Sequence, residues 1–280
     1  MPAGPGDDTL DTLASVVRYT DPSRVIVVVD DGSGLAGQGG RIRDLSGDIA
    51  VIPALTGMPD GRFGGLWLKL AAAYRWLLER YQPGIVLRLD TDALLIGPGL
   101  EAAAEQAFER DPAVGLLGSY RIGPDGEKRD SAWPARQIRA EAGLRGLAHP
   151  QRRRAIRGHL RLAHAHGYRD GDHVLGGAYI HSSAALGRIH ENGWFSEPWM
   201  MTSSIGDDHY FSLLTVAAGY QIADFGGPSD PMALRWRGLP AHPADLLAAG
   251  KLVTHSVRFW RDLDEGQVRG IFARARAQVT

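Results

Sequence analysis

The chain has 280 residues, of which 44% are hydrophobic, and a formal net charge of -1 at pH 7. This length suffices for one large domain with its own core, and the near-neutral charge favours neither nucleic acid nor an anionic membrane as a partner. The absence of cysteine excludes disulfides and thiolate metal sites. No stretch approaches the ~18 apolar residues of a membrane span, and residues 1–8 carry no apolar leader, so we expect a cytoplasmic protein.

Strand and helix patterns alternate over the first 118 residues. Apolar residues at helical spacing predict a helix over residues 9–19, and a β-branched apolar run predicts a strand over residues 25–29. The further elements predicted in this half are a glycine-rich loop at 32–40, a short strand at 50–52, a helix at 66–81, a strand ending at Asp90 and a strand at 114–118. This alternation predicts a mostly parallel sheet with helices on both faces.

An arginine-rich segment over residues 121–170 interrupts the alternation. Pro134 and Pro150 punctuate it, and Ile156, Leu160 and Ala163 mark one face of a short helix. We expect a helical insertion that presents either a solvated surface or a lid over the active face. Because aromatic residues do not interleave its arginines, a nucleic-acid site is the less favoured interpretation. After it, strands are predicted at 174–181 and 220–225, and a helix at 207–218.

Two carboxylates one residue apart, Asp90 and Asp92, follow a predicted buried strand. They can project beyond the carboxyl end of that strand, where ligands of open α/β sheets bind. Two hard carboxylate oxygens suit Mg²⁺ or Mn²⁺ better than Zn²⁺. Acids at a strand end also cap the helix that follows, so this pair does not by itself establish a metal site.

Three further segments carry polar residues at the ends of predicted elements. Asp30 and Asp31 end the second apolar run and are followed by Gly32 and Ser33; Asp207 and Asp208 begin a predicted helix; and His255 lies in a strand-like run over residues 252–258. With the glycine pair at 176–177, the order of these segments resembles that of the GT-A glycosyltransferases, above all the broad family 2 type. The resemblance extends from about residue 9 to about residue 260.

The resemblance implies a metal and diphosphate site at Asp90 and Asp92. A late histidine completes the metal shell in some GT-A families, and His255 is similar to it, since a neutral imidazole suits Mn²⁺. Without the resemblance, His255 would more simply be a packed histidine with a hydrogen bond beside its strand. The implied cofactor is Mn²⁺ or Mg²⁺, and the implied donor is a nucleotide-diphosphate sugar.

The nucleoside of that donor is expected beside Asp30 and Asp31, although Asp-Gly-Ser is also ordinary turn chemistry. Trp67 and Lys69 stand where related enzymes approach the nucleotide. The competing interpretation makes Trp67 a core residue and Lys69 a solvated helix residue.

The donor sugar and the acceptor are expected near three further positions. Gly176 and Gly177 match the segment that passes close to the donor sugar. Arg258, three residues after His255, could reach the diphosphate, although an arginine on a surface strand is ordinary. Trp199 is the aromatic residue that we favour as a platform for a sugar, although aromatic residues are more often core.

Asp208 is the favoured general base for the acceptor hydroxyl, with Asp207 orienting the acceptor or sharing the role. The sequence does not separate the two, and either could simply cap the helix. Because adjacent carboxylates oppose double ionisation, partial burial could raise one of their pKa values. A base opposite the leaving group implies single displacement with inversion.

The resulting expectation is one GT-A domain over residues 1–280. It divides into a nucleotide-binding half at about 9–118, the insertion at about 121–170 and an acceptor-binding half at about 171–262. Family 2 proteins begin with a hydrophobic strand, and only eight polar or small residues precede the first predicted helix, so that strand is expected to be missing. The expected activity is transfer of a hexose from a UDP-sugar to a hydroxyl of a small molecule or glycan.

Two alternatives remain. Residues 89–94 and 205–208 also resemble the first and last motifs of haloacid-dehalogenase-like phosphatases, with Asp90 as nucleophile and Asp92 as acid/base. Such a first motif normally lies near the N-terminus, and Leu94 replaces the favoured threonine or valine. The second alternative is a non-catalytic sugar-nucleotide-binding protein on the same fold, in which the acceptor-side acids would be expected to be lost.

Overall fold

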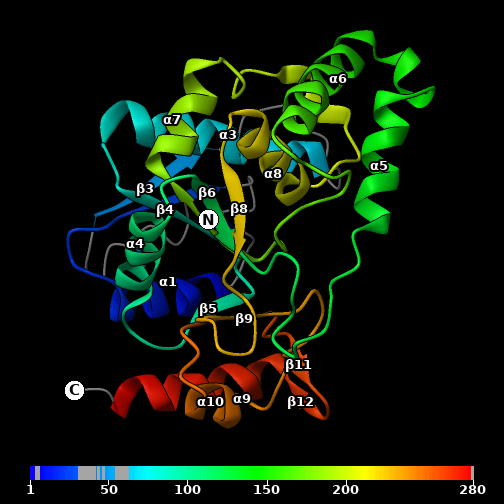
Figure 1. Ribbon diagram of the computed structural model, residues 1–280. Coiled ribbons are helices and arrows are strands. Elements are labelled where there is room, and N and C mark those ends of the chain that lie inside the picture. Colours follow the sequence, from blue (N-terminus) through cyan, green and yellow to red (C-terminus); the bar gives the residue numbers. More distant parts are fainter. Residues whose placement is uncertain (4–6, 31–41, 43–44, 46–47, 54–62, 279–280) are drawn as a thin grey trace.

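The computed structural model describes residues 1–3, 7–30, 42, 45, 48–53 and 63–278 (Figure 1). The predicted loop at 32–40 and Asp31 lie outside these residues. The helices are α1 (Asp7–Tyr19), α3 (Phe63–Arg80), α4 (Leu100–Arg110), α5 (Ala132–Ala142), α6 (Pro150–Ala165), α7 (Ser183–Glu191), α8 (Asp207–Ala217), α9 (Pro243–Ala248) and α10 (Glu265–Gln278), with short 3₁₀ helices η2 (Arg145–Ala148) and η3 (Pro198–Thr202).

The strands are short and form several small sheets. Their bounds are β1 (Pro2–Ala3), β2 (Val25–Asp30), β3 (Asp48–Pro53), β4 (Ile85–Leu89), β5 (Ala93–Leu95), β6 (Val114–Gly118), β7 (Ala178–Ser182), β8 (Gln221–Asp224), β9 (Met232–Leu234), β10 (Val253–His255), β11 (Phe259–Trp260) and β12 (Leu263–Asp264). The main sheets have the orders β1-β2-β3, β4-β7-β6-β8 and β5-β10-β9.

The four-stranded sheet lies at the centre of the molecule and is mixed. Strand β7 runs antiparallel to both β4 and β6, whereas β6 and β8 are parallel. Strands β1, β2 and β3 are all parallel. The expected α/β architecture is therefore confirmed, with one antiparallel strand in the central sheet. The predicted strand at 174–181 begins later than expected, at Ala178, because Gly177 has a positive φ of 96° that extended strands do not adopt.

Helices cover both faces of the central sheet (Figure 1). Val86 and Leu116 face one core together with α3, α7 and α8. Leu89 and Leu117 face a second core with α4 and with the end of α1. The alternation of side chains along each strand divides the apolar residues between the two cores. Figure 1 also shows α5 and α6 of the predicted insertion at one end of the molecule, with α9 and α10 at the other.

A two-residue strand, β1, precedes the first helix in place of the hydrophobic strand that we expected to be missing. Its two residues pair in parallel with the end of β2, Pro2 opposite Val29 and Ala3 opposite Asp30. Two small residues are enough for an extended backbone to add to an exposed strand edge, although they carry no apolar pattern by which to find it. No helix among the described residues has the length and the apolar character that crossing a bilayer would require.

Helix α10 has no counterpart among the predicted elements. Its Arg269 is only 8% exposed and points toward α1. The guanidinium donates to Asp11 Oδ2 at 3.0 Å, to Glu265 Oε1 at 2.8 Å and to the carbonyl of Thr91 at 2.7 Å. Thr12 on α1 donates to the same carbonyl at 2.7 Å. These bonds fix the backbone between Asp90 and Asp92.

We expect Arg269→Met to lower the free energy of unfolding by about 2 kcal/mol, because hydrogen bonds from a charged donor contribute about that amount. Urea denaturation measures the change. The matched control is Arg274→Met, an exposed arginine on the same helix, which should change stability by less than about 0.5 kcal/mol. Equal losses in the two variants would show that Arg269 does not fasten α10 to the domain.

Candidate functional site

The three residues expected to bind a metal come together at the end of β4. The chain leaves β4 after Leu89, passes through Asp90, Thr91 and Asp92, and enters β5. Strand β10 runs antiparallel to β5 with His255 opposite Ala93, which brings the imidazole beside Asp92. One possible ligand atom from each of Asp90, Asp92 and His255 lies within 4.8 Å of the others.

The hydrogen bonds of His255 favour a cation at this cluster. Its Nδ1 is 2.8 Å from the carbonyl oxygen of Arg235, so this nitrogen carries a proton that it donates. In the neutral ring Nε2 then presents a lone pair, and it lies 3.2 Å from Asp92 Oδ1. The lone pair of Nε2 and the carboxylate oxygen are both acceptors and repel each other at this distance. Their approach is favourable only with a second proton on the ring or with a cation bound between them. An oxygen and nitrogen donor set of this kind fits Mn²⁺ or Mg²⁺.

Asp92 is held in place by further donors. Ser256 Oγ and Arg258 Nε lie 2.9 and 2.8 Å from its Oδ2. Burial alone would raise the pKa of Asp92, but hydrogen bonding and charge from His255, together with Arg258 and Ser256, lower it well below the usual range. Asp92 is therefore ionised at neutral pH. Arg258, which we expected near a diphosphate, pairs with this carboxylate and is itself 68% exposed.

Gly176 and Gly177 connect this cluster to the start of α8. The carbonyl of Gly177 accepts from the amide of Asp90 at 2.8 Å, and a Cβ on Gly177 would lie 2.5 Å from the ring of His255. Glycine is thus required at 177 both by its positive φ and by the imidazole. The amide of Gly176 donates to Asp208 Oδ2 at 2.9 Å.

Arg88, which the sequence analysis passed over, joins the two parts of the site from inside. Its side chain is 2% exposed, with Nη1 2.9 Å from Asp90 Oδ2 and Nη2 3.2 Å from Asp207 Oδ2. Tyr179 donates its hydroxyl to Asp207 Oδ2 at 3.0 Å. The only signal in the sequence is that Arg88 is the single charged residue within the apolar run of β4.

The two adjacent acids at the start of α8 have different environments. Asp207 is buried against Arg88 and Tyr179, and burial raises its pKa to about 6 even though the charge of Arg88 opposes the rise. Asp208 is 15% exposed. Burial would raise the pKa of Asp208 too, but His209, His173 and Arg88 and the amide of Gly176 lower it. One of the two pKa values is raised, as we expected for adjacent carboxylates. Asp207, which we expected to orient the acceptor or to share the role of base, points toward Arg88 and Tyr179.

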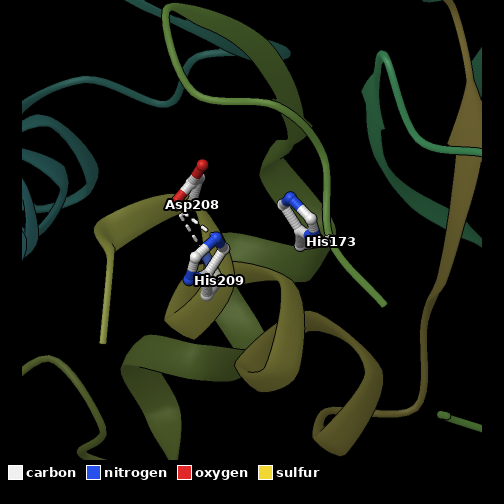
Figure 2. A group of neighbouring side chains, drawn as sticks. All are labelled: His173, Asp208 and His209. Atoms are coloured by element: carbon white, nitrogen blue, oxygen red, sulfur yellow. Dashed lines mark hydrogen bonds and ion pairs between the residues drawn. The ribbon is translucent and has the colours of Figure 1, made fainter. Parts of the chain in front are cut away.

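Asp208 lies in a second cluster with His173 and His209 (Figure 2). The two imidazoles meet edge to face with centroids 4.5 Å apart. His173 Nδ1 is 2.8 Å from the carbonyl of Gly171, and its Nε2 is 2.9 Å from Arg129 Nη2. Since arginine only donates, His173 is the neutral tautomer with the proton on Nδ1, and burial lowers its pKa to about 4. The guanidinium already occupies the free lone pair, so this cluster does not fit a metal.

Of the two predicted aromatic residues, Trp67 lies in the core and Trp199 is half-buried against it. Trp67 is fully buried and packs on Tyr210 and Phe211 of α8, with centroids 5.3 and 5.9 Å away. Trp199 on η3 packs against the same core. The indole that contacts the second cluster belongs to Trp133 of α5, whose ring centroid lies 5.5 Å from that of His209.

The remaining expected nucleotide residues are less closely tied to the clusters. Lys69 is half-buried on α3, and Asp30 is half-buried at the end of β2, between β1 and β3. Neither belongs to the two ligand clusters found among the described residues. Asp31 is outside the described part of the chain.

Comparisons with known proteins find no matching family model and no curated protein with significant similarity. Among solved structures, the chain is similar to the bifunctional glycosyltransferase WbbM, at 11% identity and a TM-score of 0.49, over 97% of this chain and 48% of that one. The chain thus spans about half of WbbM. It is also similar to the galactosyltransferase LgtC in complex with donor and acceptor sugar analogues, at 14% identity and a TM-score of 0.48, over 100% and 95% of the two chains.

A third similar structure is glucosyl-3-phosphoglycerate synthase from Mycobacterium tuberculosis in complex with Mn²⁺, UDP and glucosyl-3-phosphoglycerate. Its identity is 17% and its TM-score 0.42, over 88% of this chain and 72% of that one. Because these identities lie below 25% and the TM-scores below 0.5, the similarities assign neither an activity nor a substrate to this chain.

The pKa of Asp207 predicts a pH dependence of stability. Its folded pKa, about 6, exceeds the ordinary value of 3.8, so the folded state binds this proton more tightly than the unfolded state. The resulting stabilisation is complete below about pH 4 and is lost as the pH rises through 6.

We therefore expect the stability of the wild type, relative to Asp207→Asn, to fall by on the order of 2 kcal/mol between pH 4 and pH 7. Urea denaturation across this range measures the difference, with the exposed Asp262→Asn as the control for loss of one carboxylate. A difference that does not vary with pH would contradict the raised pKa.

Proposed function

We propose that this chain is a metal-dependent glycosyltransferase with the GT-A fold. It would transfer a hexose from a nucleotide-diphosphate sugar, with UDP as the nucleotide, to a hydroxyl of an acceptor, with inversion. One observation carries the proposal. A cluster of Asp90, Asp92 and His255 that could hold a divalent cation is connected through Arg88 and the glycine pair at 176–177 to a separate carboxylate, that of Asp208. The choice of UDP depends on the resemblance of the sequence motifs to family 2 enzymes.

Sugar transfer needs compensation of the charge that develops on the departing diphosphate. A divalent ion held by Asp90, Asp92 and His255 would act there as a Lewis acid. Ser256 and Arg258 hold Asp92, and the carbonyl of Arg235 fixes the tautomer in which His255 Nε2 faces the cluster. These contacts orient the ligands, which is the part that surrounding hydrogen bonds play in metal sites.

Sugar transfer also needs a base for the acceptor hydroxyl, and Asp208 is the proposed one. The amides of Gly176 and His209 each donate to it at 2.9 Å, which keeps the carboxylate ionised and fixes its orientation. In the proposed step the acceptor oxygen forms a bond to the anomeric carbon, and the bond from that carbon to the diphosphate oxygen breaks. The hydroxyl proton passes to Asp208, and the electron pair of the broken bond leaves with the diphosphate.

The geometry gives less support to the phosphatase alternative. A nucleophilic Asp90 would have to attack while paired with the buried guanidinium of Arg88 at 2.9 Å. The proposed acid/base, Asp92, has a lowered pKa and therefore holds a proton poorly. The non-catalytic alternative predicts donor binding without turnover, so the experiments below distinguish it.

We expect Asp92→Asn to weaken the binding of UDP in the presence of Mn²⁺ by about 100-fold or more, since the variant loses a charged ligand. Isothermal titration calorimetry with UDP, with Mn²⁺ present and with the metal chelated, measures this. The wild type should show metal-dependent binding, and the control Asp262→Asn should match it. Equal metal-dependent affinity in Asp92→Asn and the wild type would remove Asp92 from the proposed metal site.

We expect Asp208→Asn to keep the affinity for UDP and Mn²⁺ but to lower turnover by about 10²- to 10⁴-fold, because the variant lacks the proposed base. Turnover is measured as UDP released from UDP-glucose and UDP-galactose in the presence of a panel of sugar acceptors. Retained turnover would exclude Asp208 as the base. A wild type that binds UDP with Mn²⁺ but turns over neither donor would favour the non-catalytic alternative.

A further inference from the structure

A cationic cavity lies beside the second cluster. It has a volume of about 440 Å³ and is lined by the segments 120–122, 128–131 and 169–173. Four cationic side chains, those of Arg121, Lys128, Arg129 and Arg169, line it. Only two carboxylates, Asp130 and Asp172, oppose them. A cavity of this size accommodates a small-molecule ligand.

Arg129 is the fixed charge of this cavity. Its Nη1 donates to the carbonyls of Ser119, Tyr120 and His173, and its Nη2 bonds to His173 Nε2. No carboxylate of the described residues lies within 4.0 Å of its guanidinium. Burial lowers the pKa of Arg129 to about 10, so the side chain remains charged at neutral pH. The charges of Asp208 and Asp224 oppose this lowering of the pKa, but neither carboxylate forms an ion pair with Arg129. The largely buried guanidinium therefore keeps a desolvation cost that an anionic ligand would offset.

Two of the other cationic side chains, those of Lys128 and Arg169, have no counter-ion of their own among the described residues. Within the described part of the chain, neither the ammonium of Lys128 nor the guanidinium of Arg169 forms an ion pair or a hydrogen bond, and both residues are exposed. The two carboxylates are engaged locally. Asp172 Oδ2 accepts from the amide of Arg169 at 3.3 Å and lies 3.8 Å from Arg121 Nη2, while Asp130 accepts from the amide of Ala132.

The cavity adjoins the part of the proposed active site that contains Asp208. His173 lines it and is also a member of the cluster with Asp208 and His209 (Figure 2). A molecule whose hydroxyl meets Asp208 would therefore have its neighbouring groups beside Arg129.

We infer that the acceptor carries an anionic group, a phosphate or a carboxylate, which binds in this cavity to Arg129, Lys128 and Arg169. The role of the bound molecule as an acceptor rests on the proposed function. The binding of an anion in the cavity does not. Guanidinium groups recognise both anions through paired hydrogen bonds. The nearby Asp208 would repel an anion placed directly on it, so the hydroxyl that reacts must be separated from the charged group.

Anion binding is tested with inorganic phosphate and with acetate, titrated calorimetrically in the absence of metal. The test variant is Lys128→Gln/Arg169→Gln, which changes two exposed residues and leaves the buried Arg129 intact. Its matched control is Arg154→Gln/Arg274→Gln, which removes the same charge from exposed positions elsewhere. We expect the wild type and the control to bind at least one anion, and the test variant to bind it about 10-fold more weakly. Equal binding in all three proteins, or none in the wild type, would overturn the inference.

The acceptor role is tested with three matched hydroxyl compounds: glucose, glucose 6-phosphate and glucuronate. UDP release from the donor should be faster with one of the two anionic sugars than with glucose, and which one distinguishes phosphate from carboxylate. The preference should diminish in the test variant. Transfer without any preference for an anion would overturn the inference and leave the proposed function standing. Anion binding that depends on Lys128 and Arg169, in a chain that transfers no sugar, would support the site and contradict the proposed function.

Discussion

The organisation of the site depends on the buried guanidinium of Arg88 between Asp90 and Asp207. A cation that is 2% exposed is stable only with close partners, and removal of one partner of a buried pair typically costs about 3–5 kcal/mol. Arg88 is opposite Tyr179 in the pairing of β4 with β7, and the hydroxyl of Tyr179 reaches the same carboxylate of Asp207. The requirement to neutralise one charge therefore fixes the end of β4 relative to the start of α8.

This constraint explains why two adjacent carboxylates do different work. Asp207 and Asp208 both benefit from the amino end of α8, where the helix dipole favours negative charge. Successive residues of a helix point in different directions, so Asp207 can neutralise the interior while Asp208 faces His209 and Gly176. Compensation of the buried charge by Asp207 leaves Asp208 in the more accessible position that a base needs.

The sequence predicted the parts of the fold that have a clear period. The helices α1, α3 and α8 and the strands β2, β4 and β6 follow from apolar spacing, and the position of Asp90 and Asp92 follows from the end of β4. Strands β5 and β9 have three residues each and carry no measurable alternation. Their existence depends on pairing with β10, which is a long-range contact.

The residues that the sequence analysis missed have partners far away in the chain. Arg88 lies in an apolar strand and Arg129 in a basic segment. Their roles become apparent only from their contacts with Asp207 and His173, respectively. The net charge of the chain likewise does not show how charge is distributed in the fold. A net charge of -1 is compatible with a carboxylate cluster at Asp90 and Asp92 and a cationic cavity around Arg129. A near-neutral total argues against a polyanion spread over the surface. It does not argue against a small anion, because a small anion responds to the local field of a few fixed charges.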